Sequence, residues 1–195
     1  MIKTVSDAIA EYGWCETKDF VPIGQVRALA EELRGQWSAG ALKHARVGAG
    51  RERRVRGEVR GDHISWLEPP GATLAQQFCL QRFETLRQEL NRELQLGLLD
   101  FECHFAVYSP GAFYRRHLDR FATDDRRTLS CVLYLNEGWS AEDGGALRLH
   151  LDHGHRDVAP HGGTLVVFLS ERFEHEVLPA RRERLSLTGW FTRRA

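Results

Sequence analysis

The stretch FECHFAVYS, Phe101 to Ser109, begins a change of sequence pattern that decides the fold class. From about Leu99 onward, apolar residues alternate with polar ones or form short continuous runs, as is typical of β-strands. Six such segments follow one another between Gly-rich or polar turns: FECHFAVYS (101–109), TLSCVLYLN (128–136), GALRLHL (145–151), TLVVFLS (164–170), HEVLPA (175–180) and RLSLTGWFT (184–192). Many short strands with close turns predict a sandwich or barrel of antiparallel sheets.

The part of the chain before this change is predicted to be mainly helical, with one short strand, HISWLE (63–68). Three segments have helical spacing: VSDAIAEYG (5–13), VPIGQVRALAEELRGQW (21–37) and PPGATLAQQFCLQRFETLRQELNRELQLG (69–97). The last is the longest, and we expect it to start at its two prolines and to end at Gly97. Its expected apolar face is formed by Leu74, Phe78, Leu86, Leu90 and Leu94. We therefore expect a mainly β fold with flanking helices, in one domain of residues 1–195 whose helices within 1–97 support a β core of residues 98–195.

The composition of the 195 residues excludes several classes of protein. There are 27 basic and 27 acidic residues, so the formal charge is zero, which argues against a partner such as nucleic acid or an anionic membrane surface. No apolar run approaches the roughly 20 residues of a membrane span, and no signal peptide is evident. The four cysteines are widely spaced without a CxxC motif, so we expect buried thiols and a cytoplasmic protein.

The tripeptide His-Leu-Asp occurs twice, as His117–Asp119 and as His150–Asp152. Residues i and i+2 of a strand point to the same side, so either copy could place an imidazole and a carboxylate at one point, as two ligands of a facial triad. The first copy is favoured because it should lie at a strand end, near the mouth of a barrel. The second runs into HGHRD, which is expected to be a solvated hairpin tip.

The context downstream adds a possible third ligand and a cation. His175 starts one predicted strand, and Arg184 opens the next, nine residues later. A cation inside a barrel is costly unless it meets an anion, and a guanidinium matches a carboxylate. A dicarboxylate bound to the metal would supply that anion. The other reading of Arg184 is one more charge in the basic stretch RRER.

Together these residues resemble the 2-oxoglutarate- and Fe(II)-dependent oxygenases. More narrowly, the chain resembles the prolyl hydroxylases of the hypoxia-inducible-factor type and their bacterial relatives that act on elongation factor Tu. The resemblance extends from about Arg56 to Trp190 and rests on VRGDHISWLE, AVYSPGAFYRRHLD, LYLNEGW, GGALRLHL, HEVLPA and RLSLTGWF. It implies a double-stranded β-helix, or jelly-roll, core.

The resemblance also implies the residues of the site, and no catalytic residue beyond the metal centre. The implied ligands of Fe(II) are His117, Asp119 and His175. The implied 2-oxoglutarate residues are Arg184 and Tyr134, on the far carboxylate, with Tyr108 and Thr188 nearby. The implied substrate residues are Arg60, Asp62, Arg127 and Trp190, where Asp62 is expected to pair with Arg127 and Trp190 to line a proline pocket. The Arg-rich segment 46–60 corresponds to a mobile finger over the substrate, and its six Arg against two Glu suggest an acidic partner surface.

The implied function is a prolyl 4-hydroxylase that acts on a protein, with elongation factor Tu as the expected substrate. It would couple O2 and the decarboxylation of 2-oxoglutarate to hydroxylation, with ascorbate as a candidate reductant and oxygen sensing as a candidate role. Three alternatives remain open at this point: an oxygenase of the same fold acting on nucleic acid or a small molecule, a non-catalytic sensing module, and a metal cupin without 2-oxoglutarate. Arg184 discriminates against the last of these.

Overall fold

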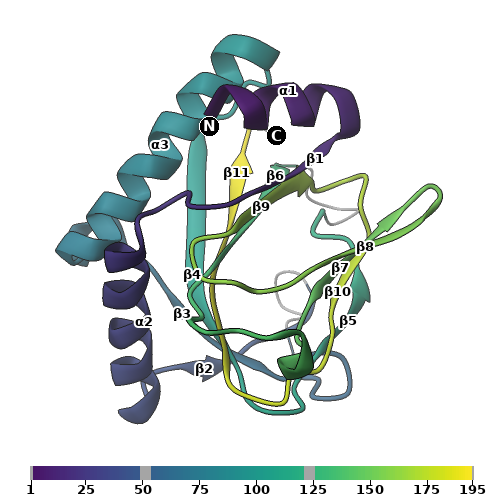
Figure 1. The fold of residues 1–195 in the computed structure, drawn as a ribbon. Coiled ribbons are helices and arrows are strands. Elements are labelled where there is room, and N and C mark those ends of the chain that lie inside the picture. The colour runs from purple at the N-terminus through teal and green to yellow at the C-terminus, as the bar shows by residue number, and fades with distance from the viewer. Residues whose placement is uncertain (1, 49–53, 121–125, 195) are drawn as a thin grey trace.

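The structure is a computed structural model that describes residues 2–48, 54–120 and 126–194. Two β-sheets face each other, and three helices flank the larger sheet (Figure 1). The helices are α1 (Ile2–Tyr12), α2 (Ile23–Ser38) and α3 (Leu74–Leu94), with short 3-10 turns η2 (Pro69–Gly71) and η3 (Ala141–Asp143). The strands are β1 (Trp14–Thr17), β2 (Lys43–His44), β3 (Asp62–Trp66), β4 (Asp100–Tyr108), β5 (Tyr114–His117), β6 (Arg127–Tyr134), β7 (Leu147–Leu151), β8 (Gly154–Val158), β9 (Leu165–Leu169), β10 (His175–Val177) and β11 (Arg184–Thr192).

The strand order confirms the expected jelly roll. The larger sheet has the order β1-β9-β6-β11-β4-β3-β2, and the smaller has the order β5-β10-β7-β8. Along the chain from β4 to β11, the strands cross repeatedly between the two sheets, and their pairing within each sheet is antiparallel. This winding encloses a space between the sheets, into which both can direct side chains.

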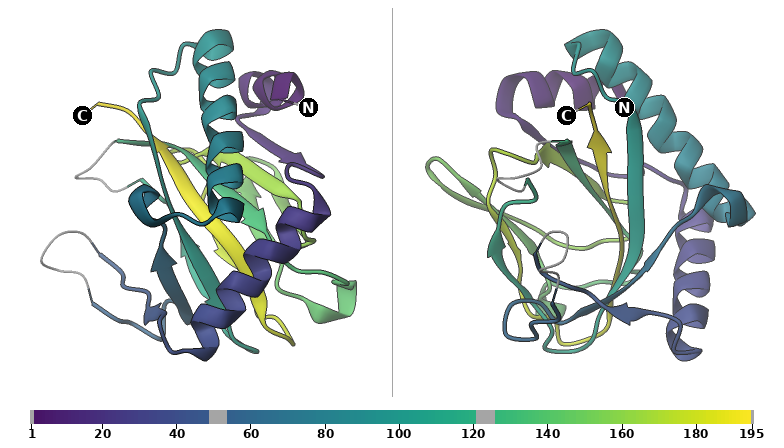
Figure 2. Two further views of the ribbon diagram at one scale, coloured as in Figure 1. Left: turned by 90° about the vertical axis from the view of Figure 1, so that its left-hand side faces the viewer. Right: turned by 180° about the vertical axis from the view of Figure 1, so that it is seen from behind.

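The larger sheet is buried on both faces, which explains its nearly continuous apolar strands. Odd-numbered residues of its central strands, such as Phe105, Leu133 and Leu187, pack in one cluster with the helices. Even-numbered residues, such as Ala106 and Tyr134, belong to a second cluster with residues of the smaller sheet. Figure 2 shows α2 and α3 in front of the strands when the helical side faces the viewer. The period of two in each strand thus divides the side chains between a helix-covered core and the space between the sheets.

The long helix differs in detail from the prediction. The two prolines form the separate turn η2, and α3 begins after Thr73, whose hydroxyl caps the helix by accepting from the backbone N–H of Gln76. The helix ends at Leu94 because Gln95 takes a left-handed conformation, so Gly97 is not its stop. The expected face is also partly wrong. Leu74 is 85% exposed, and the buried face of α3 is instead Cys79, Phe83, Leu86 and Leu90, together with Gln76.

The N-terminal part contributes more than the expected helices. Residues 2–97 supply β1, β2 and β3 to the larger sheet, and only β3 was predicted as a strand. The segment expected to be a turn, 152–157, largely forms β8, which pairs with β7. All four cysteines are buried and unpaired as expected, in the cluster between helices and sheet: Cys15, Cys79, Cys103 and Cys131. Within the described residues, none of the helices is both long and apolar enough to cross a membrane.

The Arg-rich segment forms a ribbon where the structure describes it. Val47 and Arg54 make an antiparallel bridge with two backbone hydrogen bonds of 2.8 and 3.0 Å. The ribbon connects β2 to β3 at the edge of the larger sheet. Residues 49–53, within the segment predicted as a finger, lie outside the described residues, as do residues 121–125 after Asp119.

Candidate active site

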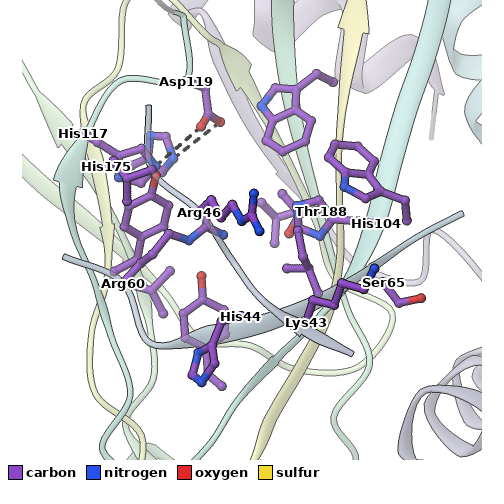
Figure 3. Close-up of a pocket in the computed structure, with 18 of the residues that line it drawn as sticks. Lys43, His44, Arg46, Arg60, Ser65, His104, His117, Asp119, His175 and Thr188 are labelled. Carbon is purple, nitrogen blue, oxygen red and sulfur yellow. Dashed lines mark ion pairs between the residues drawn. The ribbon is translucent and has the colours of Figure 1, made fainter. Parts of the chain in front are cut away.

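A pocket of about 790 Å³ opens between the two sheets beside the β2–β3 ribbon (Figure 3). Its walls come from both sheets and from the ribbon, so segments far apart in the sequence meet there. Nine of the eleven predicted site residues line it: Arg60, Tyr108, His117, Asp119, Arg127, His175, Arg184, Thr188 and Trp190. The other two, Asp62 and Tyr134, are buried just behind lining residues and contact them.

The three predicted metal ligands converge at one end of this pocket. His117 ends β5 and His175 begins β10, and the two residues are direct partners in an antiparallel pair. Asp119 follows β5 by two residues, and its carboxylate oxygens lie 3.5 Å from Nε2 of each imidazole. The ligand atoms all lie within 4.8 Å of one another, a spacing that fits a single metal ion. Dashed lines in Figure 3 mark the two contacts of Asp119.

Hydrogen bonds behind the ligands fix their orientation and protonation. His117 Nδ1 is 2.7 Å from the carbonyl of Arg115, and His175 Nδ1 is 3.2 Å from that of Phe173. A carbonyl only accepts, so Nδ1 carries the proton in both rings and Nε2 presents its lone pair to a metal. Burial lowers the pKa of His175 to about 4, which keeps this imidazole neutral at physiological pH.

Asp119 is held as a carboxylate. Burial alone would raise its pKa, but the attraction of the two imidazoles when they are protonated, together with a hydroxyl, outweighs burial and holds the pKa well below its ordinary value. That hydroxyl belongs to Ser130 of β6, which donates to Asp119 Oδ2 at 2.7 Å and lies 2.9 Å from the hydroxyl of Ser170. Two neutral imidazoles and one carboxylate are the donor set that suits a non-haem ferrous ion.

A buried cation lies at the start of β11. Arg184 is 1% exposed and donates from Nε to the carbonyl of Gly145 at 2.9 Å, but its Nη2 has no hydrogen-bond partner within the described residues. Its Cζ is 5.0 Å from the ring of Tyr108 and 5.1 Å from the ring of Tyr134. The buried hydroxyl of Tyr134 also lacks a partner, and burial raises its pKa to about 12. Buried unpaired donors of this kind are costly and call for an anionic acceptor, so the arrangement fits a bound carboxylate.

Arg60 and Asp62 form a second buried charge pair on the pocket wall. Arg60 donates from Nε and Nη2 to the two carboxylate oxygens of Asp62, at 2.7 and 2.5 Å. Its guanidinium lies 4.2 Å from the ring of Tyr114, which stacks on the imidazole of His117 at 3.6 Å. The pair therefore supports one metal ligand through an aromatic ring.

The prediction that Asp62 pairs with Arg127 is wrong. Asp62 lies opposite Tyr108 in the β3–β4 ladder, whereas Arg127 pairs with Glu102, six residues away along β4. At about 3.4 Å per residue, the two positions are roughly 20 Å apart along the strand. Arg127 instead stacks on the indole of Trp190, with its Cζ 3.6 Å from the ring.

Aromatic residues around Trp190 make the other end of the pocket. Trp190 lies 6.3 Å from Trp66 and 5.5 Å from His104, between ring centroids, and Thr188 is the cross-strand partner of His104. Burial lowers the pKa of His104 to about 4, and the nearby guanidinium of Arg60 acts in the same direction. This end is therefore a flat-walled aromatic recess with a neutral imidazole.

Several residues of the site were not predicted. Ser130, Tyr114, His104 and Trp66 have no signal in the sequence that would separate them from structural residues. Ser186 is different, because RLSLT alternates polar and apolar residues and thereby predicts that Ser186 shares a face with Arg184 and Thr188. Its hydroxyl is buried without a partner, and it pairs with Tyr134 across the sheet.

The second His-Leu-Asp copy does not form a metal cluster among the described residues. His150 lies in β7, not at the hairpin tip, and its Nε2 is 3.1 Å from a carboxylate oxygen of Glu176. Asp152 is 80% exposed at its side chain and contacts Arg172. This difference favours the first copy as the candidate metal site.

Comparison with known proteins agrees with the geometry. The family described as the 2OG-Fe(II) oxygenase superfamily matches residues 103–192, which contain all three candidate ligands and Arg184. Among curated proteins, a hypoxia-inducible factor prolyl hydroxylase of Caenorhabditis elegans is 27% identical over 201 residues. The match covers 94% of this chain but only 27% of that relative, so the chain spans about a quarter of its length.

Two solved structures are similar over nearly the whole chain. A prolyl-4-hydroxylase of Pseudomonas putida is 52% identical, with a TM-score of 0.90 and complete coverage of both chains. A prolyl hydroxylase of Trichoplax adhaerens, in complex with a peptide fragment of the hypoxia-inducible factor oxygen degradation domain, has a TM-score of 0.86 at 24% identity. That match covers 98% of this chain and 88% of the other, and at this identity it supports the fold alone.

Proposed function

The chain belongs to the 2OG-Fe(II) oxygenase superfamily, and from that premise we propose that it is a prolyl 4-hydroxylase of a protein substrate. The family uses Fe(II), 2-oxoglutarate and O2. The 52% identity to the Pseudomonas putida prolyl-4-hydroxylase supports the choice of proline as the target within this family.

One observation carries the co-substrate assignment, namely the buried cation without an anion in the metal pocket. Among the described residues, Arg184 Nη2 and the hydroxyl of Tyr134 are unpaired donors, and the Arg184 guanidinium lies 5.1 Å from the Tyr134 ring. Arg184 lines the same pocket as the three candidate ligands. A dicarboxylate that reaches the metal with one end would satisfy both donors with the other. A metal cupin that binds no such acid has no use for this cation.

The proposed roles of the residues follow from their positions. His117, Asp119 and His175 would hold Fe(II) on one face and leave its other face to the pocket. Arg184 and Tyr134 would hold the far carboxylate of 2-oxoglutarate, with Tyr108 and Thr188 beside it. Bound Fe(II), with 2-oxoglutarate and O2, supplies the oxidant that converts a C–H bond of the proline ring to C–OH. The described side chains orient the reactants and need not transfer a proton in that step.

The aromatic recess supports a substrate with a small flat ring. Trp190, stacked by Arg127, would line the proline pocket, and the bidentate pair of Arg60 and Asp62 would shape the opposite wall. Elongation factor Tu is the first substrate to test, because the sequence motifs resemble those of the bacterial hydroxylases that act on it. A cytoplasmic location accords with that substrate and with four buried, unpaired cysteines.

Mass spectrometry tests the proposal directly. Purified elongation factor Tu is incubated with the enzyme, Fe(II), 2-oxoglutarate, O2 and ascorbate, and its peptides are examined for a gain of one oxygen on proline. We expect the gain to require each of Fe(II), 2-oxoglutarate and O2, and to be absent with His117→Ala. If succinate forms rapidly but no proline in any candidate protein is oxidised, prolyl hydroxylation is the wrong assignment.

A further inference from the structure

The mouth of the pocket carries positive charge that the protein itself does not neutralise. Five exposed cations lie on or beside the β2–β3 ribbon, and none has an ion-pair partner among the described residues: Lys43, Arg46, Arg54, Arg56 and Arg115. Two exposed anions, Glu58 and Glu68, share the same region. The charge of the whole chain is zero, so this excess is local.

The other cations of the pocket differ because each has a partner or an assigned ligand. Arg60 is neutralised by Asp62, and Arg127 by Glu102. Arg184 lies deep in the pocket and is assigned to the co-substrate. Lys43 and Arg46 line the pocket without any such partner. Figure 3 shows Lys43 on the side of the pocket away from the triad, and Arg46 between the triad and Thr188.

We propose that Lys43 and Arg46 bind acidic side chains that flank the target proline, so that the preferred substrate is an acidic peptide segment. This inference rests on the proposed prolyl hydroxylation and specifies its substrate. A peptide that places its proline in the recess beside Trp190 would occupy the pocket that Lys43 and Arg46 also line. The positive potential continues outward over three more exposed cations, Arg54, Arg56 and Arg115. It would attract an acidic segment before contact.

Charge at the mouth could also attract two other anions. A nucleic acid would need a basic face that continues over the surface, and the zero net charge of the chain gives no sign of one. Free 2-oxoglutarate could be guided by the same residues on its way to Arg184. An acidic peptide is favoured because Lys43 and Arg46 are exposed, whereas Arg184, which is assigned to the co-substrate, is 1% exposed. The experiment below separates the three.

The test uses two synthetic peptides with one central proline, identical except that Asp and Glu beside the proline are replaced by Asn and Gln. Hydroxylation is followed by mass spectrometry, and binding of labelled peptides by fluorescence anisotropy with Mn(II) and 2-oxoglutarate present. We expect the acidic peptide to have a roughly three- to tenfold higher kcat/KM, mainly because its KM is lower. Two ion pairs at the rim, together with electrostatic steering, would produce a difference of this size. The difference should shrink as salt is raised from about 0.05 to 0.5 M.

The double variant K43E/R46E should lose this preference and favour a peptide flanked by Lys. Its matched control is K18E/R34E, which changes the net charge equally at two exposed cations that do not line the pocket. The control should keep the preference of the unsubstituted enzyme. If K43E/R46E and K18E/R34E both lose the preference for the acidic peptide, net charge and not the pair at the rim is responsible, and the proposal is overturned.

The remaining outcomes are also decisive. Equal kcat/KM and equal binding for the two peptides would overturn the acidic-substrate inference and leave prolyl hydroxylation intact. If neither peptide is hydroxylated, proline hydroxylation is in question, and the anisotropy still decides whether acidic flanks are preferred. A larger rise in the KM for 2-oxoglutarate than for peptide in K43E/R46E would assign the cations to the co-substrate. Tighter binding of a single-stranded oligonucleotide than of the acidic peptide, lost in K43E/R46E, would assign them to nucleic acid.

Discussion

His117 and His175 are opposite each other in the β5–β10 pair, and their ring centroids are 4.2 Å apart. Strand register alone therefore brings two of the three candidate ligands together, and both rings are already oriented by backbone carbonyls. Asp119 comes from the loop after β5 and depends on a hydrogen bond from Ser130 for its position. The loop ligand is thus oriented by a side-chain hydrogen bond, whereas the two imidazoles are oriented by backbone carbonyls.

Ser130→Ala should weaken metal binding without unfolding the protein. The variant removes the 2.7 Å hydrogen bond to Asp119, and loss of such a supporting contact typically costs about 10- to 100-fold in metal affinity. Isothermal titration with Mn(II) or anaerobic Fe(II) measures the effect. Ser6→Ala is the control, because Ser6 is also buried but lies in α1, away from the site. Unchanged affinity in Ser130→Ala would show that the strand register and loop suffice to place Asp119.

Arg184→Gln should raise the KM for 2-oxoglutarate by roughly 10- to 100-fold, the range expected for lost charge-assisted hydrogen bonds. Tyr134→Phe should raise it less, because only one neutral donor is lost. In both variants the affinity for Mn(II) without 2-oxoglutarate should stay within about twofold of normal, as measured by titration. Equal losses of metal and co-substrate affinity would contradict the role assigned to Arg184.

Gly145→Ala should impair 2-oxoglutarate binding through Arg184. A Cβ at this position would lie 2.8 Å from Cβ of Ala180 and 3.3 Å from Cδ of Arg184, and the carbonyl of Gly145 accepts from that guanidinium. We expect the KM for 2-oxoglutarate to rise several-fold while the KM for peptide changes little. Gly154→Ala is a matched control, since Gly154 also has a positive φ but meets no atom within 4 Å. The same rise in both variants would trace the effect to backbone strain.

Asp62→Asn should destabilise the fold by about 3 kcal/mol, because it leaves the largely buried Arg60 without its anion. For a chain of this length, that corresponds to a fall in Tm of roughly 6 to 12 °C in a calorimetric scan. Glu102→Gln makes the same chemical change in the more exposed pair with Arg127 and should cost under about 1 kcal/mol. Equal shifts in the two variants would mean that burial does not distinguish these pairs.

His104 should make stability fall at acid pH. Its folded pKa of about 4 lies below the ordinary value of 6.5, so the unfolded chain binds more protons between these values. The stability contributed by neutral His104 is therefore complete above pH 6.5 and is lost as the pH falls toward 4. Urea unfolding should show the free energy of unfolding falling by about 3 kcal/mol more in the unsubstituted protein than in His104→Met across this window.

The parts of the fold that could be predicted are those in which local pattern and burial agree. The six predicted strand segments were found because alternation or continuous apolarity follows from a sheet with helices on one face and a second sheet on the other. The strands β1, β2 and β8 were missed because their residues, WCET, KH and GHRDV, show no regular apolar alternation. Leu74 was expected on the buried face of α3, but it is the first residue of a helix that begins five residues after the first proline, and it is 85% exposed.

The site shows the same limit. The triad and Arg184 could be predicted because each belongs to a recognisable motif. The partner of Asp62 was predicted wrongly: it is Arg60, two residues earlier in the sequence. The expected partner, Arg127, is excluded by the register of β3 against β4, which no local pattern records. Ser130 and His104 were missed for the related reason that their roles come from side chains on other strands. Ser186 could have been predicted, because the alternation of RLSLT places it on the same face as Arg184 and Thr188.

Along β11, every second side chain from Arg184 through Ser186 and Thr188 to Trp190 belongs to one face. With the roles proposed above, β11 would separate the residue assigned to the co-substrate, Arg184, from the residue assigned to the target proline, Trp190, by about 20 Å. This spacing is set by the geometry of a strand that is paired on both sides. A substitution at Trp190 would therefore change the target while Arg184 still binds the same co-substrate. One strand would thus keep co-substrate binding and substrate recognition apart.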